Sequence, residues 1–248
     1  MWTPEIFTII IFTFVLAGFV KGVTGLGLPT VALALLAAFL GLGPAIVLML
    51  VPSLVTNIWQ ALAGGAFVEI LRRQWPMLIT GSIVTVGFSV FAASVNTSYL
   101  LMLLGVVLCL YSGISLFTPQ IALSAKTENW LSPVVGLMTG ALTGLTGTFV
   151  VPSVPYFQAL GLSPRLLVQT MGVWFTIATL SLGLGLTGTG LLSGDLVQLS
   201  MIAIIPALSG MWLGQRVRNR LPAKKFRKVF FTTLFALGLY IALKAIVS

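Results

Sequence analysis

The chain has 248 residues, of which 58% are hydrophobic and 7% are charged, and its mean hydropathy is +1.12. An ordinary soluble domain carries roughly 25% charged residues, so this composition excludes a water-soluble protein and predicts one embedded in a lipid bilayer. The chain has no His, one Cys and four acidic residues. These numbers exclude a Ser-His-Asp triad, a zinc site and an internal disulfide, and we expect neither an enzyme nor a metal or other cofactor.

Apolar runs bounded by Pro, Gly or charge predict ten helices. In chain order they cover residues 6–22, 29–40, 44–66, 76–95, 98–117, 131–144, 152–161, 164–186, 195–214 and 229–247. Six of them reach the roughly 20 residues needed to cross a hydrocarbon core of about 30 Å. The four short ones form two adjacent pairs, and a break rich in Gly and Thr separates the members of each pair.

Two sequence patches recur in the same order in the second half of the chain. Ala38-Phe-Leu-Gly-Leu-Gly-Pro44 is followed 120 positions later by Gln158-Ala-Leu-Gly-Leu-Ser-Pro164, and Thr24-Gly25-Leu26 is followed 119 positions later by Thr143-Gly144-Leu145. Because both patches lie beside a short pair, they predict an internal duplication. Repeat one of the transmembrane domain covers residues 1–117, repeat two covers residues 131–248, and residues 118–130 form a cytoplasmic linker.

The basic residues predict how the repeats are oriented. With the loop holding Arg72 and Arg73 in the cytoplasm, the positive-inside rule places Lys126 and the basic cluster of residues 216–228 on the same side, and both termini outside. Repeat one then starts outside and repeat two starts inside. The predicted fold is an all-α polytopic membrane protein of two inverted-topology repeats, each with a short broken or re-entrant helix pair followed by three long transmembrane helices. The short pairs are either re-entrant or fully spanning.

The net charge of +9 has the same explanation. Basic residues beside the inner ends of membrane helices anchor the protein to anionic lipid, so we expect the lipid bilayer and no nucleic acid as a partner. The sequence carries no signal for an oligomeric state.

The two breaks predict a transport site. Half-length helices at matching positions of inverted repeats mark substrate sites near the bilayer midplane. Each break delivers the N-terminus of a second half-helix, with N–H donors and a partial positive charge, which suits a small oxyanion held between the repeats. The candidate substrate-binding residues lie in the breaks or are polar residues of long helices: Lys21, Gly22, Thr24, Gly25, Gly27, Asn57, Gln60, Thr143, Gly144, Thr146, Gly147, Thr148, Gln169 and Thr170.

Each kind of candidate has a structural alternative. Lys21 is an ionisable residue within a membrane segment, and its alternative role is to snorkel to the membrane surface. Glycines at four-residue spacing also allow close helix packing. The amides and hydroxyls in the long helices serve equally well as hydrogen bonds between helices. Trp59 and Trp174 lie near the middle of helices, where they either line a cavity or pack in the core.

The scarcity of acidic residues bears on the energetics. The four acidic residues fall at the ends of predicted helices or in the linker and the chain has no His, so no buried carboxylate or His is expected to form an ordinary proton relay. An exported anion gains about 2.3 kcal/mol per charge per 100 mV when the cell interior is negative, which favours export driven by the potential. Uptake would need a coupling ion, and a proton carried by Lys21 keeps coupled transport open.

Glycine and proline motifs in both breaks resemble those of the TauE/SafE family of prokaryotic membrane proteins. The resemblance rests on Gly22-Val-Thr-Gly25-Leu-Gly27-Leu-Pro29, on Gly140-Ala-Leu-Thr-Gly144-Leu-Thr-Gly147 with Pro152 after it, and on the duplicated helix layout. It implies export of sulfite, sulfoacetate or a related organosulfonate across a prokaryotic inner membrane. An anion channel or an uptake permease for the same anions is the alternative, and a non-transporting scaffold is a third possibility.

Overall fold

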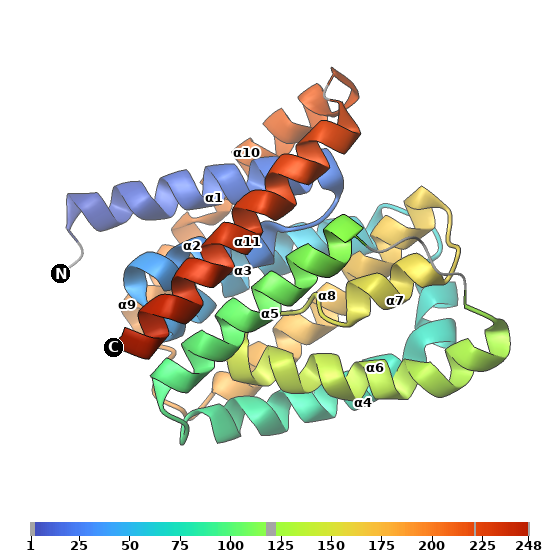
Figure 1. The fold of residues 1–248 in the computed structure, drawn as a ribbon, viewed down its shortest axis with the longest axis horizontal. Helices are drawn as coiled ribbons and strands as arrows, with labels where there is room; N and C mark the ends of the chain where they lie inside the picture. Colours follow the sequence, from blue (N-terminus) through green and yellow to red (C-terminus); the bar gives the residue numbers. More distant parts are fainter. Residues whose placement is uncertain (1–2, 118–122, 221, 248) are drawn as a thin grey trace. The chain divides into compact units, whose positions relative to one another are not determined.

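The computed structural model describes residues 3–117, 123–220 and 222–247, and these residues form helices without any strand (Figure 1). In chain order the helices are α1 (Pro4–Thr24), α2 (Leu28–Leu40), α3 (Leu42–Leu62), α4 (Phe67–Ala92), α5 (Thr97–Phe117), α6 (Ala125–Thr146), α7 (Ser153–Ala159), α8 (Pro164–Leu186), α9 (Gly194–Ile202), α10 (Ile204–Val217), the 3₁₀ turn η1 (Arg218–Arg220) and α11 (Ala223–Val247). Within the described ranges, seven helical segments are long and apolar enough to cross a membrane. The expected all-α chain with several membrane-spanning helices is confirmed.

The chain forms two compact units that do not coincide with the predicted repeats. Unit 1 comprises Met1–Pro52, Asn96–Phe117 and Leu192–Ser248, and unit 2 comprises Ser53–Val95 and Thr118–Leu191. The boundary falls inside α3, and each unit takes helices from both halves of the chain. The inverted duplication therefore remains a prediction.

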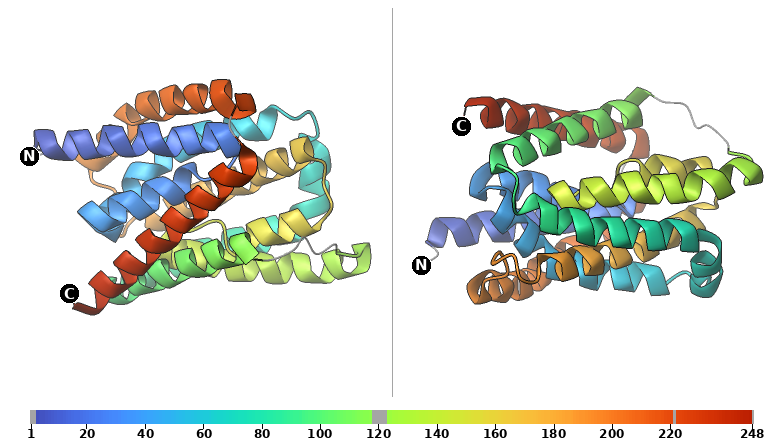
Figure 2. Two further views of the ribbon diagram at one scale, coloured as in Figure 1. Left: turned by 45° about the horizontal axis from the view of Figure 1, so that its top comes forward. Right: turned by 90° about the horizontal axis from the view of Figure 1, so that it is seen from below.

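In unit 1, α1 packs along α10, α5 packs along α11, and α2 contacts α1 and α11 (Figure 2). The α1–α10 contact brings backbone against backbone. A Cβ atom built on Gly18 would lie 2.1 Å from the Ala207 carbonyl oxygen, and one built on Gly210 would lie 2.1 Å from the Val15 carbonyl oxygen. Glycine is the only residue that permits this approach, as is common where membrane helices pack closely.

In unit 2, α4 packs against α6 and α8. A Cβ atom on Gly136 would lie 2.5 Å from the Met77 carbonyl oxygen, and one on Gly140 would lie 2.6 Å from the Gly81 carbonyl oxygen. The α4–α6 contact thus uses glycines in the same way as the α1–α10 contact. Close packing, one of the two roles considered for the spaced glycines, is confirmed in both units.

Two of the helices that start earlier than the sequence predicts, α4 and α6, contain a proline. α4 begins at Phe67 and passes through Pro76, and α6 begins at Ala125 and passes through Pro133. The predicted boundaries at residues 76 and 131 are therefore wrong. A proline removes one helix hydrogen bond, but membrane helices tolerate it because neighbouring groups satisfy the freed carbonyl.

Because α4 and α6 are longer than predicted, several basic residues that were expected in loops lie in helices. Arg72 and Arg73 lie in α4 instead of in a loop, and Lys126 lies in α6. Of the predicted linker, residues 118–122 lie outside the described residues and residues 125–130 are helical. The first members of the two pairs are also not short, since α1 has 21 residues and α6 has 22. Of the four helices in the two pairs, only the second members are half-length, α2 with 13 residues and α7 with 7.

The last third of the chain departs from the predicted helices in two places. The segment 195–214, expected as one helix, is interrupted at Ala203 between α9 and α10. Pro206 lies shortly after this interruption and has no N–H to donate to the Ile202 carbonyl, four residues before it. α11 begins at Ala223 instead of residue 229, so Lys224 and Lys225 belong to its first turn.

Candidate functional site

The first break occupies the three residues between Thr24, where α1 ends, and Leu28, where α2 begins. Gly25 has φ 77° and donates its N–H to the Lys21 carbonyl at 2.7 Å, which caps α1. Gly27, with φ 97°, precedes α2. Residues with a side chain rarely adopt such φ values, so the two glycines allow the chain to leave one helix and enter the next within three residues.

The hydroxyl of Thr24 is engaged inside the first break. It lies 2.9 Å from the Val20 carbonyl oxygen and 2.8 Å from the Leu26 carbonyl oxygen, and it accepts the Leu26 N–H at 3.0 Å. A hydroxyl has one hydrogen to donate, and here a backbone carbonyl takes it. Thr24 therefore shapes the break and does not offer a free donor to an anion.

Lys21 lies in the last turn of α1, immediately before the first break. Its side chain is 4% exposed. A lysine that snorkelled to the membrane surface would leave its ammonium exposed, so the structure favours a role inside the protein. An ionisable side chain buried within a membrane segment is a candidate for function, and Lys21 lies directly beside the first break.

The second break has the same local design over six residues, between Thr146 at the end of α6 and Ser153 at the start of α7. Gly147 has φ 75° and donates its N–H to the Thr143 carbonyl at 2.8 Å. The Thr146 hydroxyl lies 2.7 Å from the Leu142 carbonyl oxygen and accepts the Thr148 N–H at 3.3 Å. These contacts repeat those of Thr24 and Gly25.

The remaining hydroxyls of the second break are also engaged. The Thr143 hydroxyl lies 2.7 Å from the Thr139 carbonyl oxygen and 3.0 Å from the Thr148 carbonyl oxygen. The hydroxyl oxygens of Thr146 and Thr148 are 3.0 Å apart. Thr143 and Thr148 are almost fully buried. The threonines thus hold the shape of this break through hydrogen bonds to its own backbone.

The helix caps change which residues of the two halves correspond. The repeated tripeptide Thr-Gly-Leu aligns Gly25 with Gly144. In the structure, however, Gly25 corresponds to Gly147, 122 positions later, because each of these two glycines ends a helix with a positive φ. The tripeptide alignment does not superimpose the two caps, because Gly144 lies inside α6, where no special φ is required. In the structural pairing, Lys21 corresponds to Thr143, since each carbonyl accepts the capping N–H.

Two candidate glycines, Gly22 and Gly144, lie within helices and face a neighbouring backbone. A Cβ atom on Gly22 would lie 2.2 Å from the Met211 carbonyl oxygen, and one on Gly144 would lie 2.7 Å from the Thr85 carbonyl oxygen. Like the caps, these glycines are 122 positions apart. Helix packing accounts for both.

Two candidate amides join α3 to α8. Gln60 donates to the Val168 carbonyl at 2.6 Å, and Gln169 donates to the Ala61 carbonyl at 2.7 Å while its carbonyl oxygen accepts the Ala66 N–H at 3.1 Å. Hydrogen bonding between helices, the alternative considered for these residues, accounts for them.

The other polar candidates lie deep in unit 2. Asn57, also in α3, is fully buried. Thr170 donates to the Leu166 carbonyl at 2.8 Å and borders a recess of about 10 Å³ beside Arg73 and Gln74.

The two central tryptophans differ in environment. Trp174 is fully buried, and its indole N–H donates to the Phe149 carbonyl oxygen of the second break at 3.1 Å. Its ring also occupies the space beside Gly81, where a Cβ atom would lie 2.5 Å from the Trp174 Cη2 atom. Trp59 is 67% exposed. Trp174 therefore packs in the core and fixes one end of the second break, whereas Trp59 does neither.

A partly buried polar network in unit 2 escaped the sequence-based prediction. Arg73 donates to both carboxylate oxygens of Glu128, at 2.6 and 2.7 Å, and Gln74 donates to the same carboxylate at 3.0 Å. Tyr156 in α7 donates to the Gln74 carbonyl oxygen at 3.3 Å. The network ties α7 to α4 and α6. The sequence-based prediction placed Arg73 in a loop and Glu128 in the linker, before the helices predicted to begin at residues 76 and 131, and so it missed this network.

A second lysine in unit 1 provides a contrast to Lys21. Lys244, in the last turn of α11, donates to the Ala38 carbonyl oxygen at 3.0 Å, near the end of α2. A positive charge at a helix C-terminus is favourable because the last carbonyls carry partial negative charge. Lys244 thus stabilises the end of α2.

Comparison with known proteins gives one match. The model of the family described as sulfite exporter TauE/SafE matches residues 10–241, which include both breaks and all candidate residues. No curated protein and no solved structure matches the chain.

Proposed function

The chain belongs to the sulfite exporter TauE/SafE family, and on this premise we propose that it exports a small sulfur-containing anion such as sulfite, sulfoacetate or a related organosulfonate. The family consists of membrane transporters, and the seven apolar helices within the described residues fit a multi-pass transporter. The observation that carries the choice of an anion is Lys21, a buried cation directly before a helix break.

We assign recognition of the anion to Lys21 and the backbone around the first break. The first N–H groups of α2 have no acceptor within their own helix, and Pro29 has no N–H to satisfy. They lie at the positive end of the helix dipole, which favours an anion. Because the Thr24 hydroxyl is engaged, backbone donors and the Lys21 ammonium supply the attraction.

The second break carries no comparable charge. It repeats the cap of the first break, but Thr143 stands where the first break has the lysine. The Trp174 indole and the Arg73 network hold the two sides of this break in place. The asymmetry concentrates charge recognition in unit 1.

The membrane potential supplies the driving force in this proposal. A singly charged anion leaving a negative interior gains about 2.3 kcal/mol per 100 mV, without a coupling ion. We also propose the inverted topology, with both termini outside. Reporter fusions at residues 72 and 222 should then report the same side of the membrane, and fusions reporting opposite sides would refute it.

The proposal is tested by anion flux in proteoliposomes. Sulfite efflux should rise with an imposed interior-negative potential and should saturate with sulfite concentration. Lys21→Gln should reduce it strongly, whereas Lys244→Gln, which removes a lysine from the last turn of another helix of unit 1, should lower thermal stability and leave flux per folded protein unchanged. Flux that is absent or insensitive to potential for every sulfur anion tested would contradict export, and non-saturating conductance would indicate a channel.

A further inference from the structure

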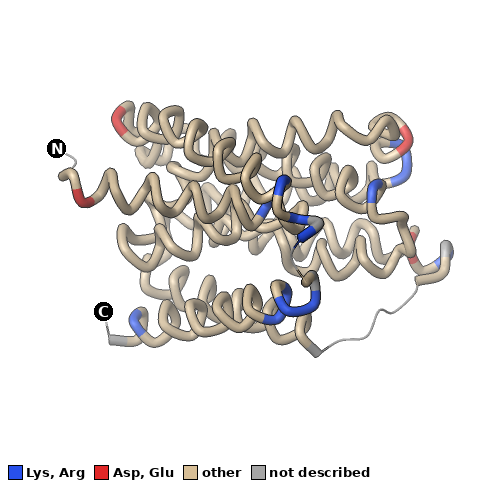
Figure 3. The backbone as a smooth tube through the Cα atoms, turned by 90° about the horizontal axis from the view of Figure 1, so that it is seen from above, with Lys and Arg blue, Asp and Glu red and all other residues tan. Residues whose placement is uncertain are grey.

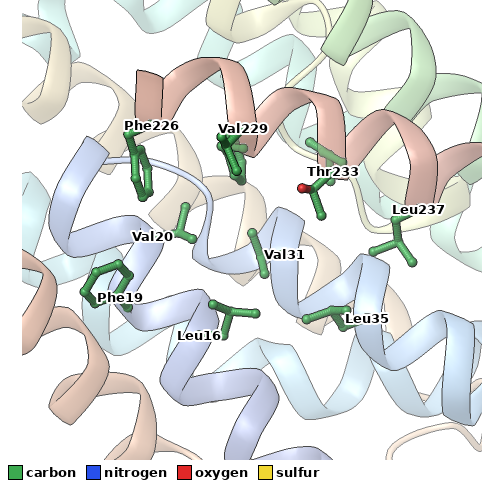
Figure 4. A pocket seen from close by; sticks show the side chains of 11 residues that line it. Leu16, Phe19, Val20, Val31, Leu35, Phe226, Val229, Thr233 and Leu237 are labelled. Atoms are coloured by element: carbon green, nitrogen blue, oxygen red, sulfur yellow. The ribbon is translucent and has the colours of Figure 1, made fainter. Parts of the chain in front are cut away.

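An apolar groove lies within unit 1 between α1, α2 and α11 (Figure 4). Its volume is about 210 Å³. It is lined by apolar side chains and one threonine, among them Leu16, Val20, Phe226, Val229, Thr233 and Leu237. We call it the α11 groove.

The α11 groove is open to the surroundings of the unit. Val229 is 59% exposed and Leu16 is 37% exposed. Both residues belong to helices that are apolar and long enough to span a membrane, so their surroundings are hydrocarbon. A hydrocarbon chain is therefore the occupant that these walls favour, since a polar ligand would find one hydroxyl, that of Thr233.

The length of the groove matches one leaflet of a bilayer. On α11 it runs from Phe226 to Leu237, eleven residues later, which corresponds to about 16 Å at 1.5 Å per residue. Half of the hydrocarbon core of a bilayer is about 15 Å thick. A single acyl chain of a phospholipid can thus lie along the groove with its headgroup at one end.

The headgroup end of the groove is basic. Phe226 marks the end of the groove toward the start of α11, and Lys224, Lys225 and Lys228 surround it in sequence and are exposed. Lys225 precedes Val229 by one helical turn, which places it on the side of α11 that forms the groove. Figure 3 shows basic residues at this end of α11. Lysine ammonium groups at a membrane surface attract anionic lipid headgroups.

From the apolar walls, the length and the basic end of this groove we infer that it binds an anionic phospholipid, with an acyl chain between α1, α2 and α11 and its phosphate at the basic start of α11, where Lys225 lies toward the groove. The bound chain would also contact the wall of the first break. A Cβ atom on Gly27 would lie 3.1 Å from the Val20 Cγ1 atom and 3.6 Å from the Phe230 Cζ atom, and both side chains line the groove. The inference goes beyond the transported anion and does not require that anion to be identified.

Native mass spectrometry of the full chain in detergent tests this inference. The protein is titrated with phosphatidylglycerol, with phosphatidylcholine of the same acyl chains, and with inorganic phosphate. We expect phosphatidylglycerol to bind at least tenfold more tightly than phosphatidylcholine, and phosphate alone to bind much more weakly. Lys224→Gln combined with Lys225→Gln should remove this preference, whereas Arg72→Gln combined with Lys126→Gln, which removes two exposed charges in unit 2, should retain it.

A second pair of variants tests the groove itself. Thr233→Trp fills the groove and should lower the affinity for phosphatidylglycerol at least tenfold, whereas Thr232→Trp, at an exposed position outside the groove, should not. If Thr233→Trp lowers the melting temperature, Val229→Trp serves as the second groove-filling variant. Equal binding of the two lipids, or equal effects of tryptophan at residues 232 and 233, would overturn the inference. None of these binding measurements depends on transport. A negative result would therefore overturn lipid binding without contradicting the proposed function.

Discussion

The two helix breaks share one backbone design and differ in charge. Each ends a long helix with a threonine and a glycine of positive φ, and each threonine hydroxyl bonds to the backbone around it. The carbonyl that accepts the capping N–H belongs to Lys21 in the first break and to Thr143 in the second. The same backbone turn thus occurs with a lysine in the first break and without one in the second.

The short helices after the two breaks are held by different means. Lys244 of α11 bonds to a carbonyl near the end of α2, whereas the side chain of Tyr156 ties α7 to Gln74 and, through it, to the ion pair of Arg73 with Glu128. α2 has 13 residues and α7 has 7, so α7 makes fewer backbone hydrogen bonds of its own. We infer that the shorter helix depends more on side-chain bonds.

The largest loss of stability is expected at the packing glycines Gly22 and Gly144, which both halves of the chain share. Gly22→Leu and Gly144→Leu each force a side chain into a neighbouring backbone, and each should destabilise the fold by about 3 kcal/mol or more. Gly113→Leu and Gly87→Leu are matched controls, because no atom lies within 4 Å of a Cβ placed at either helical position. Thermal unfolding followed by tryptophan fluorescence measures the loss. A normal melting temperature for either test variant would contradict the packing role.

A smaller effect, on transport instead of stability, should separate the breaks. Lys21→Thr gives the first break the residue that the second has, and sulfite flux should fall about tenfold to a hundredfold, as expected for losing a charge-assisted bond of roughly 1.5–3 kcal/mol. Thr143→Val should change flux less than threefold, because the Thr143 hydroxyl already bonds to the Thr139 and Thr148 carbonyls. Equal losses in the two variants would show that both breaks contribute equally to anion recognition.

The smallest effect should again be shared by the two breaks. Gly25→Ala and Gly147→Ala place a side chain at φ values of 77° and 75°, which costs about 1–2 kcal/mol each. Gly113→Ala, in the open interior of α5, should be neutral or stabilising because alanine favours a helix. Urea or thermal unfolding measures these differences. A clear inequality between Gly25→Ala and Gly147→Ala would argue against their equivalence as caps.

Sequence alone predicted the position of both breaks and the nature of the residues in them. Glycine, threonine and proline between apolar runs mark a helix end whatever surrounds them, so this prediction did not depend on tertiary contacts. It did not reveal which threonine hydroxyls were already engaged. The Thr24 and Thr146 hydroxyls bond to backbone atoms within four residues, but that choice depends on the backbone angles of the break.

Proline does not mark helix ends consistently in this chain. Pro76 and Pro133 lie inside α4 and α6, whereas Pro206 lies just after the interruption between α9 and α10. The same residue type therefore continues a helix in two places and accompanies an interruption in a third. Neighbouring helices decide this by satisfying or failing to satisfy the freed carbonyl, and the local sequence does not contain that information.

Composition and apolar patterning by themselves determined that this protein is an α-helical membrane protein with two breaks rich in glycine and threonine and a basic cluster before its last helix. Those properties follow from the cost of placing polar groups in hydrocarbon, which acts on each residue separately. Tertiary structure alone decided which glycines pack, which amides join α3 to α8, that Lys21 is buried, and that Arg73 meets Glu128. Each of these depends on contact between segments far apart in the chain.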